Sequence, residues 1–543
     1  MSQKTDFDVI VVGAGFAGLY MVYKMREAGR SVRAFEVGTG VGGTWYWNRY
    51  PGARCDIDSM EYSFGFDEDL EQEWEWTERY STQPEILSYL ENVADRFDLR
   101  RDIQFQTRVL SAEFCDSTDV NRSGHWVVKT DDGREWRARA FVSAVGCLSA
   151  ANTPDFEGLD NFTGDLYHTA RWPHDGVDFS GRRVAVIGTG SSAIQSIPLI
   201  AEQAQHLTVF QRTPNYSIPA WNAPLESSYQ QEVKARYREL RAANREVFGC
   251  FGGLGNEEGI ELPEAAALTR EQQQFVLEEF WKVGGLVFIG AFADMTRNPE
   301  ANEIASEFVR NKIRSIVDDP VTAELLCPKT HALACKRPCV DTGYFKTFNQ
   351  PHVDLIDVSA TGIERITPTS VVGGGREVSV DALVLATGFD AMTGSLNAID
   401  IRGREGQALR DKWSAGPLTY LGLGSAGFPN LFIITGPGSP SVLTNMVVSI
   451  EQHVEFISDC LDYMDEHGHH LIEPTRQAET DWVAHVNEVA SEFVYPTCNS
   501  WYLGANVPGK PRVFMPHPGF PPYREKCEEV VERGYEGFIF DAV

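Results

Sequence analysis

Two glycine-rich segments have the spacing that brings backbone against the pyrophosphate of a dinucleotide. The first, Gly13-Ala-Gly15-Phe16-Ala-Gly18, follows a short apolar run and precedes a helical pattern. Gly13 permits a tight turn, Gly15 lets the backbone approach the phosphates, and Gly18 allows helix and strand to pack closely. The next apolar run ends in Glu36. Because its carboxylate can accept hydrogen bonds from ribose hydroxyls and repels a 2′-phosphate, this segment predicts a site for FAD or NAD.

The second segment, residues 188–193 (GTGSSA), has the same strand-to-helix context. Alanine replaces the third glycine, at a position that governs only helix–strand packing. The following strand ends in Gln211-Arg212-Thr213, and an arginine there can bind a 2′-phosphate through two hydrogen bonds. This segment therefore predicts an NADPH site. Its predicted contacts are Thr189, Gly190, Ser191, Ser192, Gln195, Arg212 and Thr213.

The elements that must position these segments are short β-branched runs that alternate with helical patterns, as in buried parallel sheets. The predicted fold class is therefore α/β, with two Rossmann-like dinucleotide-binding domains (FAD and NADP) plus a helical insertion. The strands are expected at 8–12, 31–35, 183–187, 207–210, 353–358 and 382–386.

A glycine-rich break inside the insertion, residues 249–255, is expected to be mobile.

The chain is expected to leave and re-enter its first domain. The predicted boundaries are 1–150 with 386–543 for the FAD-binding domain, 151–219 with 322–385 for the NADP-binding domain, and 220–321 for the insertion.

Two longer motifs lie close to the glycine-rich segments. Residues 42–56 (GGTWYWNRYPGARCD) combine flat aromatic rings with exposed backbone, which suits the dimethylbenzene side of an isoalloxazine. Residues 162–173 (FTGDLYHTARWP) fit neither a helical nor a strand period, so we expect a bendable linker between the two domains. Together the two motifs resemble the signatures of the Baeyer–Villiger monooxygenases.

This resemblance implies roles for individual residues. In the turn Lys336-Arg337-Pro338 it implies that Arg337 is the catalytic arginine, that Asp56 orients it and that Lys336 contacts coenzyme phosphate; Trp501 is implied to fold over bound NADP. The loop with Ser441, Val442 and Leu443 is implied to border the substrate pocket. The residues assigned to FAD are Gly13, Gly15, Phe16, Gly18, Glu36, Thr44, Trp45, Tyr46, Trp47, Asp56, Tyr62, Val109 and Met446, and those added for NADP are Lys336, Arg337 and Trp501.

The reaction that the resemblance implies converts a ketone to an ester or lactone. NADPH reduces FAD, O₂ adds to the flavin as a C4a-peroxide, and the peroxide attacks the carbonyl carbon. Arginine does not lose its proton at working pH, so Arg337 would keep the peroxide anionic and stabilise the oxyanion that follows. The proline-rich residues 515–523 depart from the family pattern, which affects the expected outer wall of the substrate cavity.

Two other functions stay open at this point. One is a flavin monooxygenase that oxygenates nitrogen or sulfur, and the other is a non-catalytic redox flavoprotein. A pyridine-nucleotide disulfide reductase is excluded because Cys55 stands alone near the flavin motif. The sequence has no metal-ligand spacing, so no metal is expected, and it has no Gly-x-Ser-x-Gly motif of a hydrolase.

Composition limits the partners. The 543 residues have a formal net charge of −29, which disfavours nucleic acids and anionic membrane surfaces. The ten cysteines show no paired framework, so we expect reduced thiols in a cytoplasmic protein, with no leader or membrane anchor. The expected partners are a small-molecule ketone and O₂, and the expected assembly is a monomer or small homo-oligomer.

Overall fold

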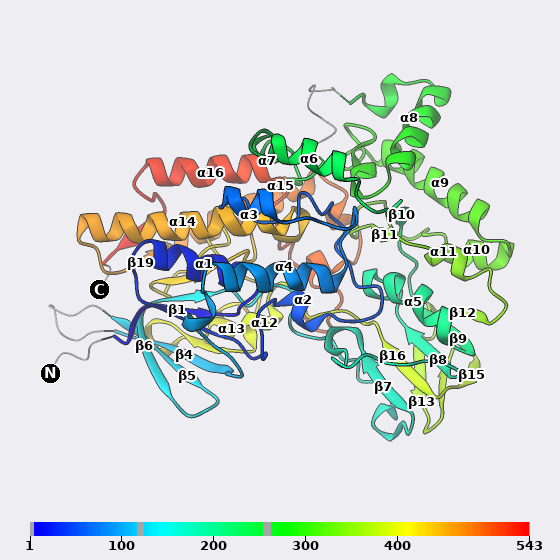
Figure 1. Cartoon of the computed structure of the whole chain (residues 1–543), viewed down its shortest axis with the longest axis horizontal. Coiled ribbons are helices and arrows are strands. Elements are labelled where there is room, and N and C mark those ends of the chain that lie inside the picture. Colours follow the sequence, from blue (N-terminus) through cyan, green and yellow to red (C-terminus); the bar gives the residue numbers. More distant parts are fainter. Residues whose placement is uncertain (1–4, 117–123, 253–261, 542–543) are drawn as a thin grey trace.

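An eight-stranded sheet dominates the N-terminal part of the computed structural model, which describes residues 5–116, 124–252 and 262–541 (Figure 1). Strands β18, β6, β1, β2 and β3 run parallel, whereas β4 and β5 form an antiparallel wing that β17 extends. The strands are β1 (Phe7–Val12), β2 (Val32–Phe35), β3 (Ile103–Gln104), β4 (Val109–Cys115), β5 (His125–Thr130), β6 (Glu135–Ser143), β17 (Asp400–Arg402) and β18 (Leu431–Ile433).

The central strand β1 is apolar because both of its faces are covered. Val11 pairs with Ala34 of β2 on one side and with Val142 of β6 on the other, and all three are fully buried. Helices α1 (Phe16–Glu27) and α14 (Met446–His467) pack side by side over one face of the sheet. The strands predicted at 8–12 and 31–35 are confirmed.

A second sheet is parallel throughout, in the order β12-β9-β8-β16-β7. Helix α5 (Ser191–Gln203) packs on one face, and a small antiparallel sheet, β13-β14-β15, covers the other. The predicted strands of this sheet are confirmed. Their bounds are β7 (Asp165–His168), β8 (Arg183–Ile187), β9 (His206–Gln211), β12 (Val353–Asp357), β13 (Ile363–Ile366), β14 (Ser370–Gly373), β15 (Arg376–Ser379) and β16 (Ala382–Leu385).

The prediction that residues 162–173 form a bendable linker is wrong for most of the segment. Residues 165–168 are β7, an edge strand whose Leu166 pairs with Leu383 of β16. Trp172 is 4% exposed and packs in the apolar core of the second sheet, within reach of Tyr167. The segment is therefore part of the second sheet's unit. Its strand escaped prediction because an edge strand of four residues has no clear alternation.

The helical insertion divides between the two units: residues 227–245 pack against the first sheet's unit, whereas residues 270–326 lie beside the second sheet (Figure 1). The chain enters the insertion after β10 (Ser217–Pro219). It later forms β11 (Cys339–Asp341), which pairs with β10 in parallel. Of the predicted break at 249–255, residues 253–255 lie outside the described residues. The helices of the insertion are α6 (Ser227–Ala235), α7 (Tyr237–Arg245), α8 (Arg270–Val283), α9 (Pro299–Ile316) and α10 (Pro320–Leu326).

Within the described residues, no helix combines the length and the apolar character needed to span a membrane.

The remaining elements complete the two units. These elements are α2 (Thr44–Trp47), α3 (Glu68–Glu73), α4 (Gln83–Arg96), α11 (Tyr344–Thr347), α12 (Gly394–Asn397), α13 (Leu409–Lys412), α15 (Arg476–Ser491), α16 (Phe520–Glu532), β19 (Ile472–Pro474) and β20 (Phe538–Phe540).

A buried histidine joins α14 to its neighbours. The backbone N–H of Thr435 donates to His453 Nδ1 (2.9 Å), so the proton of the neutral ring is on Nε2, which donates to the Tyr523 hydroxyl (2.7 Å). Tyr523 in turn donates to the carbonyl oxygen of Leu421 (2.7 Å). Protonation of the ring would put a second N–H, on Nδ1, directly against the N–H of Thr435, so the charged ring is disfavoured. Burial lowers the pKa of His453 to about 3.

We expect this histidine to make stability fall in acid. The unfolded chain takes up a proton on His453 below its ordinary pKa of 6.5, whereas the folded chain does so only near 3. Stability is therefore lost as pH falls from 6.5 towards 3, by up to about 1.4 kcal/mol per pH unit. Urea unfolding across this range measures the slope. His453→Gln should be less stable at neutral pH, and its stability should depend less steeply on pH. His467→Gln, at the exposed end of α14, should keep the wild-type stability and slope. Equal slopes would contradict the assignment.

Candidate active site

The first glycine-rich segment forms a cradle with no room for side chains. Gly13 has a φ of +108°, and a Cβ there would lie 2.5 Å from the carbonyl oxygen of Ala144. A Cβ on Gly15, which precedes α1, would lie 3.3 Å from the Cα of Gly43. The start of α1 therefore meets the aromatic motif backbone to backbone. With no side chain on these glycines, the N-terminal N–H groups of the helix can bind a pyrophosphate.

Glu36 closes the end of this cradle. Its carboxylate accepts hydrogen bonds from the backbone N–H groups of Ala14 (2.9 Å) and Gly38 (2.8 Å), and the residue is 7% exposed. Burial raises the pKa of Glu36, and the backbone donors offset part of that rise. The sequence did not show these backbone partners. They orient the carboxylate at the end of β2, where a ribose would lie.

The aromatic motif packs beside the cradle as α2. The indole N–H of Trp45 donates to the Tyr62 hydroxyl (3.2 Å), and the Phe16 ring lies 5.3 Å from the Tyr62 ring. Tyr46 bonds to the Thr39 hydroxyl (2.8 Å) and is buried. The structure thus brings Phe16, Trp45 and Tyr62 together.

The other predicted FAD contacts are less tightly grouped. Thr44 and Trp47, at the two ends of α2, are half-buried, and so is Met446, the first residue of α14. Val109 is different. It begins β4 in the antiparallel wing and packs in a separate apolar cluster. The structure does not bring Val109 to the group around Phe16.

Arg337 lies between the two units and is fixed by three hydrogen bonds. Its Nε donates to Asp56 Oδ2 (2.6 Å) and its Nη2 donates to Asp56 Oδ1 (2.9 Å). Its Nη1 donates to the carbonyl oxygen of Val442 (2.7 Å) in the predicted substrate loop. The predicted pair of Arg337 and Asp56, 281 residues apart, is therefore brought together in bidentate geometry.

The charge of this guanidinium is secure. Burial by itself would lower the pKa of Arg337, but the carboxylate of Asp56 more than offsets that effect, and the pKa lies above its ordinary value. Tyr502, next to Trp501 in sequence, is 2% exposed and adjoins the same guanidinium. Tyr502 was not among the residues predicted for the site. Its position beside the predicted Trp501 was the available signal.

The second glycine-rich segment forms a similar but more open cradle. A Cβ on Gly188 would lie 2.3 Å from the carbonyl oxygen of Ala386, whereas Gly190 has open space around it. Thr189 donates to the carbonyl oxygen of Thr213 (2.8 Å), which fixes the turn after β9. Gln195 donates to the carbonyl oxygen of Arg54 (3.1 Å), so it also ties α5 to the aromatic motif.

Two of the predicted NADP contacts are already bonded within the protein. The Ser191 hydroxyl lies 3.3 Å from Cys339 Sγ, and the Ser192 hydroxyl lies 3.1 Å from the Thr169 hydroxyl. Both remain at the N-terminus of α5, where backbone N–H groups can face an anion.

Two cations adjoin this second cradle. Arg212 is exposed, and Lys336 is half-buried with its ammonium donating to the carbonyl oxygen of Asn499 (2.6 Å). Burial lowers the pKa of Lys336, and the charge of Arg212 lowers it further. An anion between them would relieve both effects. The arrangement therefore fits a phosphate group.

A disulfide between Cys335 and Cys498 corrects the prediction of reduced thiols throughout. Their Cα atoms are 6.3 Å apart, within the usual range for a disulfide. The remaining eight cysteines are free. The spacing of 163 residues gave no signal, because only the fold brings the two segments together. Trp501 begins a short helix (Trp501–Leu503) three residues after Cys498 and is half-buried against Tyr502.

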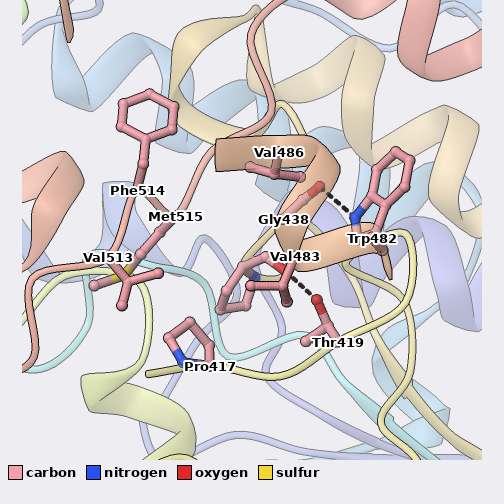
Figure 2. A pocket seen from close by; sticks show the side chains of 10 residues that line it. Pro417, Thr419, Gly438, Trp482, Val483, Val486, Val513, Phe514 and Met515 are labelled. Atoms are coloured by element: carbon pink, nitrogen blue, oxygen red, sulfur yellow. Dashed lines mark hydrogen bonds between the residues drawn. The ribbon is translucent and has the colours of Figure 1, made fainter. Parts of the chain in front are cut away.

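The two segments predicted to border the substrate cavity lie against each other. The N–H of Gly438 donates to the carbonyl oxygen of Met515, and the N–H of His517 donates to that of Ser439 (2.7 Å). Ser441, Val442 and Leu443 form a buried 3₁₀ turn (Ser441–Leu443). Figure 2 shows a pocket lined in part by Gly438 and Met515 of these two segments, where Trp482 donates to the carbonyl oxygen of Gly438 (3.0 Å). None of its lining residues is a predicted site residue.

Comparisons with known proteins agree with this geometry. A family model described as flavin-binding monooxygenase-like matches residues 6–223. The solved structure of an oxidised steroid monooxygenase bound to NADP is 53% identical, has a TM-score of 0.91 and is matched over 98% of this chain and 99% of its own. It shares the α/β fold.

Two curated relatives match over nearly their whole length. A phenazine N-monooxygenase of Lysobacter antibioticus is 41% identical over 99% of this chain and 98% of its own. A Baeyer–Villiger monooxygenase of Pseudooceanicola batsensis is 42% identical over 99% of this chain and 96% of its own. The protein described here belongs to the family of Baeyer–Villiger monooxygenases.

Proposed function

We propose that this protein uses FAD, NADPH and O₂ to insert an oxygen atom beside the carbonyl group of a ketone, forming an ester or lactone. The proposal rests on one observation above all, the guanidinium of Arg337 held by Asp56 and by the carbonyl oxygen of Val442. This arrangement fixes a permanent cation between the aromatic motif, which carries Asp56, and the substrate loop, which carries Val442. The family of the relatives supports the same reaction.

The residues present fit both cofactors. The N-terminus of α1, Glu36 and the rings around Phe16 would hold FAD, since the first cradle admits backbone contacts without steric conflict. The N-terminus of α5 would hold the pyrophosphate of NADPH, and Arg212 with Lys336 would hold its 2′-phosphate.

The chemistry divides between cofactor and protein. Bound FAD, reduced by NADPH, supplies the electrons that activate O₂. Arg337 keeps its proton and stabilises negative charge that develops on the reacting oxygen atoms of the substrate. Asp56 and Val442 restrict the rotation of the guanidinium, while Nη1 and Nη2 each retain a second N–H outside these bonds. Trp501, which is half-buried, and Tyr502, which is buried, would exclude water from this side.

A second candidate function is oxygenation of an aromatic nitrogen. The relative named phenazine N-monooxygenase, 41% identical, favours it. This reaction also needs FAD and NADPH, so the two cradles do not discriminate. A cation placed to stabilise an oxyanion fits a carbonyl substrate better, because nitrogen attack forms no oxyanion on the substrate.

Product analysis tests the proposal directly. Purified holoenzyme receives NADPH, O₂ and one compound at a time from a panel of linear, cyclic, aryl and steroid ketones plus phenazine, and gas or liquid chromatography with mass spectrometry identifies products. We expect an ester or lactone from at least one ketone. N-oxide formation without any ester would support the second candidate, and NADPH oxidation without any oxygenated product would overturn both.

Coenzyme choice gives a sharper prediction. Arg212→Ala removes the charge-assisted bonds to the 2′-phosphate, so we expect KM for NADPH to rise by about tenfold to a hundredfold. NADH lacks that phosphate, and its KM should stay the same. Steady-state oxidation of both coenzymes measures the effect. Arg238→Ala, whose side chain is 82% exposed and pairs with Glu68, serves as the matched control. A parallel rise for NADH would remove Arg212 from this role.

We also propose the domain boundaries predicted above. Sheet membership supports them, because β1 to β6 share a sheet with β17 and β18, whereas β7 to β9 share one with β12 and β16. After β16 ends at Leu385, the chain leaves the second sheet and returns to the first, where β17 is the next strand.

A further inference from the structure

The only disulfide among the described residues joins two segments that meet at Arg337. Cys335 lies two residues before Arg337 in the turn of residues 334–338, here called the Arg337 turn. Cys498 lies three residues before Trp501 in residues 495–510, here called the Trp501 segment. The bond therefore connects a turn of the second sheet's unit to a segment of the C-terminal part of the chain.

Few other contacts join the Trp501 segment to the Arg337 turn. The Lys336 ammonium donates to the carbonyl oxygen of Asn499 (2.6 Å), and Cys335 Sγ lies 3.7 Å from the Thr497 hydroxyl and from the carbonyl oxygen of Tyr495. Tyr502 adjoins the Arg337 guanidinium. Hydrogen bonds of these kinds contribute about 3 kcal/mol at most, so the covalent disulfide is the strongest connection at this end of the segment.

The far end of the Trp501 segment is held to the first sheet's unit instead. The Lys510 ammonium donates to Asp390 Oδ1 (2.6 Å), and the Asn506 amide donates to the carbonyl oxygen of Phe389. Cleaving the disulfide would remove the covalent attachment at the near end and leave there the bond from Lys336 and the packing of the buried Tyr495 and Tyr502. Trp501 is only half-buried and lies between the two attachments, so the covalent bond restricts its position.

We propose that Cys335 and Cys498 are a reversible thiol–disulfide pair that holds the Trp501 segment against the Arg337 turn. Cys335 is fully buried, whereas Cys498 is half-exposed, so an external thiol attacks Cys498 Sγ and releases Cys335 as a thiolate. A second thiol then frees Cys498 from the mixed disulfide. The sum is one protein disulfide and two external thiols giving two protein thiols and one external disulfide.

The reverse step needs a two-electron oxidant, and we assign it to hydrogen peroxide. Two cysteine thiols and one H₂O₂ give the disulfide and two water molecules. Reduced flavin that transfers electrons to O₂ without oxygenating a substrate yields H₂O₂. Under the proposed function, turnover without a ketone substrate would therefore re-form the disulfide and hold the Trp501 segment against the Arg337 turn. The thiol chemistry itself does not depend on that function.

The pair can be tested without any turnover. Thiol titration of the denatured full-length protein should find eight free thiols before reduction and all ten after it. A peptide map without reductant should contain the 335–498 cross-link. Ten free thiols in protein treated with H₂O₂ would overturn the proposal.

Coenzyme binding tests what the pair does. We expect dithiothreitol to raise the Kd of NADP⁺ for the FAD-loaded protein by roughly tenfold, because the Trp501 segment loses its covalent attachment. Cys498→Ser should show the same Kd with or without reductant. Cys115→Ser is the matched control, since Cys115 is also half-exposed and free, and it should behave as the wild type.

The outcomes separate this proposal from the proposed function. An unchanged Kd on reduction, in protein that carries the cross-link, would overturn the role given to the pair while leaving ester formation untouched. A cross-linked protein whose Kd rises on reduction but which makes no ester would retain the pair and defeat the proposed function.

Discussion

Arg337→Ala should bind FAD and oxidise NADPH but form almost no ester. The guanidinium bridges the Asp56 carboxylate and the substrate loop, and removing a preorganised donor to a developing oxyanion costs about 3–4 kcal/mol, or roughly a thousandfold in kcat. Electrons from NADPH would then leave as H₂O₂. Parallel assays of NADPH, ester and H₂O₂ measure this change in product ratio.

Two further variants separate charge from folding. Arg337→Lys keeps a positive charge but cannot bind Asp56 through two parallel bonds, so its ester yield should lie between those of wild type and Arg337→Ala. Arg238→Ala removes an exposed arginine and should match the wild type. Flavin content reports on folding in each protein. Wild-type ester yields from flavin-loaded Arg337→Ala would end the assignment of Arg337.

The parts that sequence predicts well are those whose signal is local. Strand β1 is a continuous apolar run because both its faces are covered, and the glycines at 13 and 188 are required by φ values of +108° and +121°. Each of these features depends on only a few adjacent residues. The same holds for the contrast between Glu36 and Arg212, which follow equivalent strands.

The parts that sequence predicts poorly depend on distant partners. Strand β7 has two exposed residues in four and exists because β16, some two hundred residues later, offers an open edge. The disulfide spans 163 residues, and the bond from Arg337 to the carbonyl oxygen of Val442 uses backbone, which no side-chain pattern reveals. The pair of Arg337 with Asp56 was predicted only because the family resemblance supplied it.

Gly18→Ala should remove FAD while leaving NADP⁺ binding intact. A Cβ on Gly18 would lie 1.9 Å from the carbonyl oxygen of Gly13, so the turn that forms the first cradle must shift. Overpacking of this kind costs roughly 3 kcal/mol, equivalent to about a hundredfold in affinity. Flavin absorbance per mole of purified protein measures the loss. The second cradle carries alanine natively at the equivalent position, Ala193, so the effect comes from local space and not from the motif.

The matched control for this variant is Gly290→Ala. A Cβ there would meet only the end of the Leu262 side chain at 3.8 Å, in the helical insertion, so flavin content should stay at the wild-type level. NADP⁺ binding to the flavin-free Gly18→Ala protein shows that the second sheet's unit has folded. Full flavin occupancy in Gly18→Ala would mean that the backbone of the first cradle can yield, and that the tight approach of α1 to β1 does not determine FAD binding.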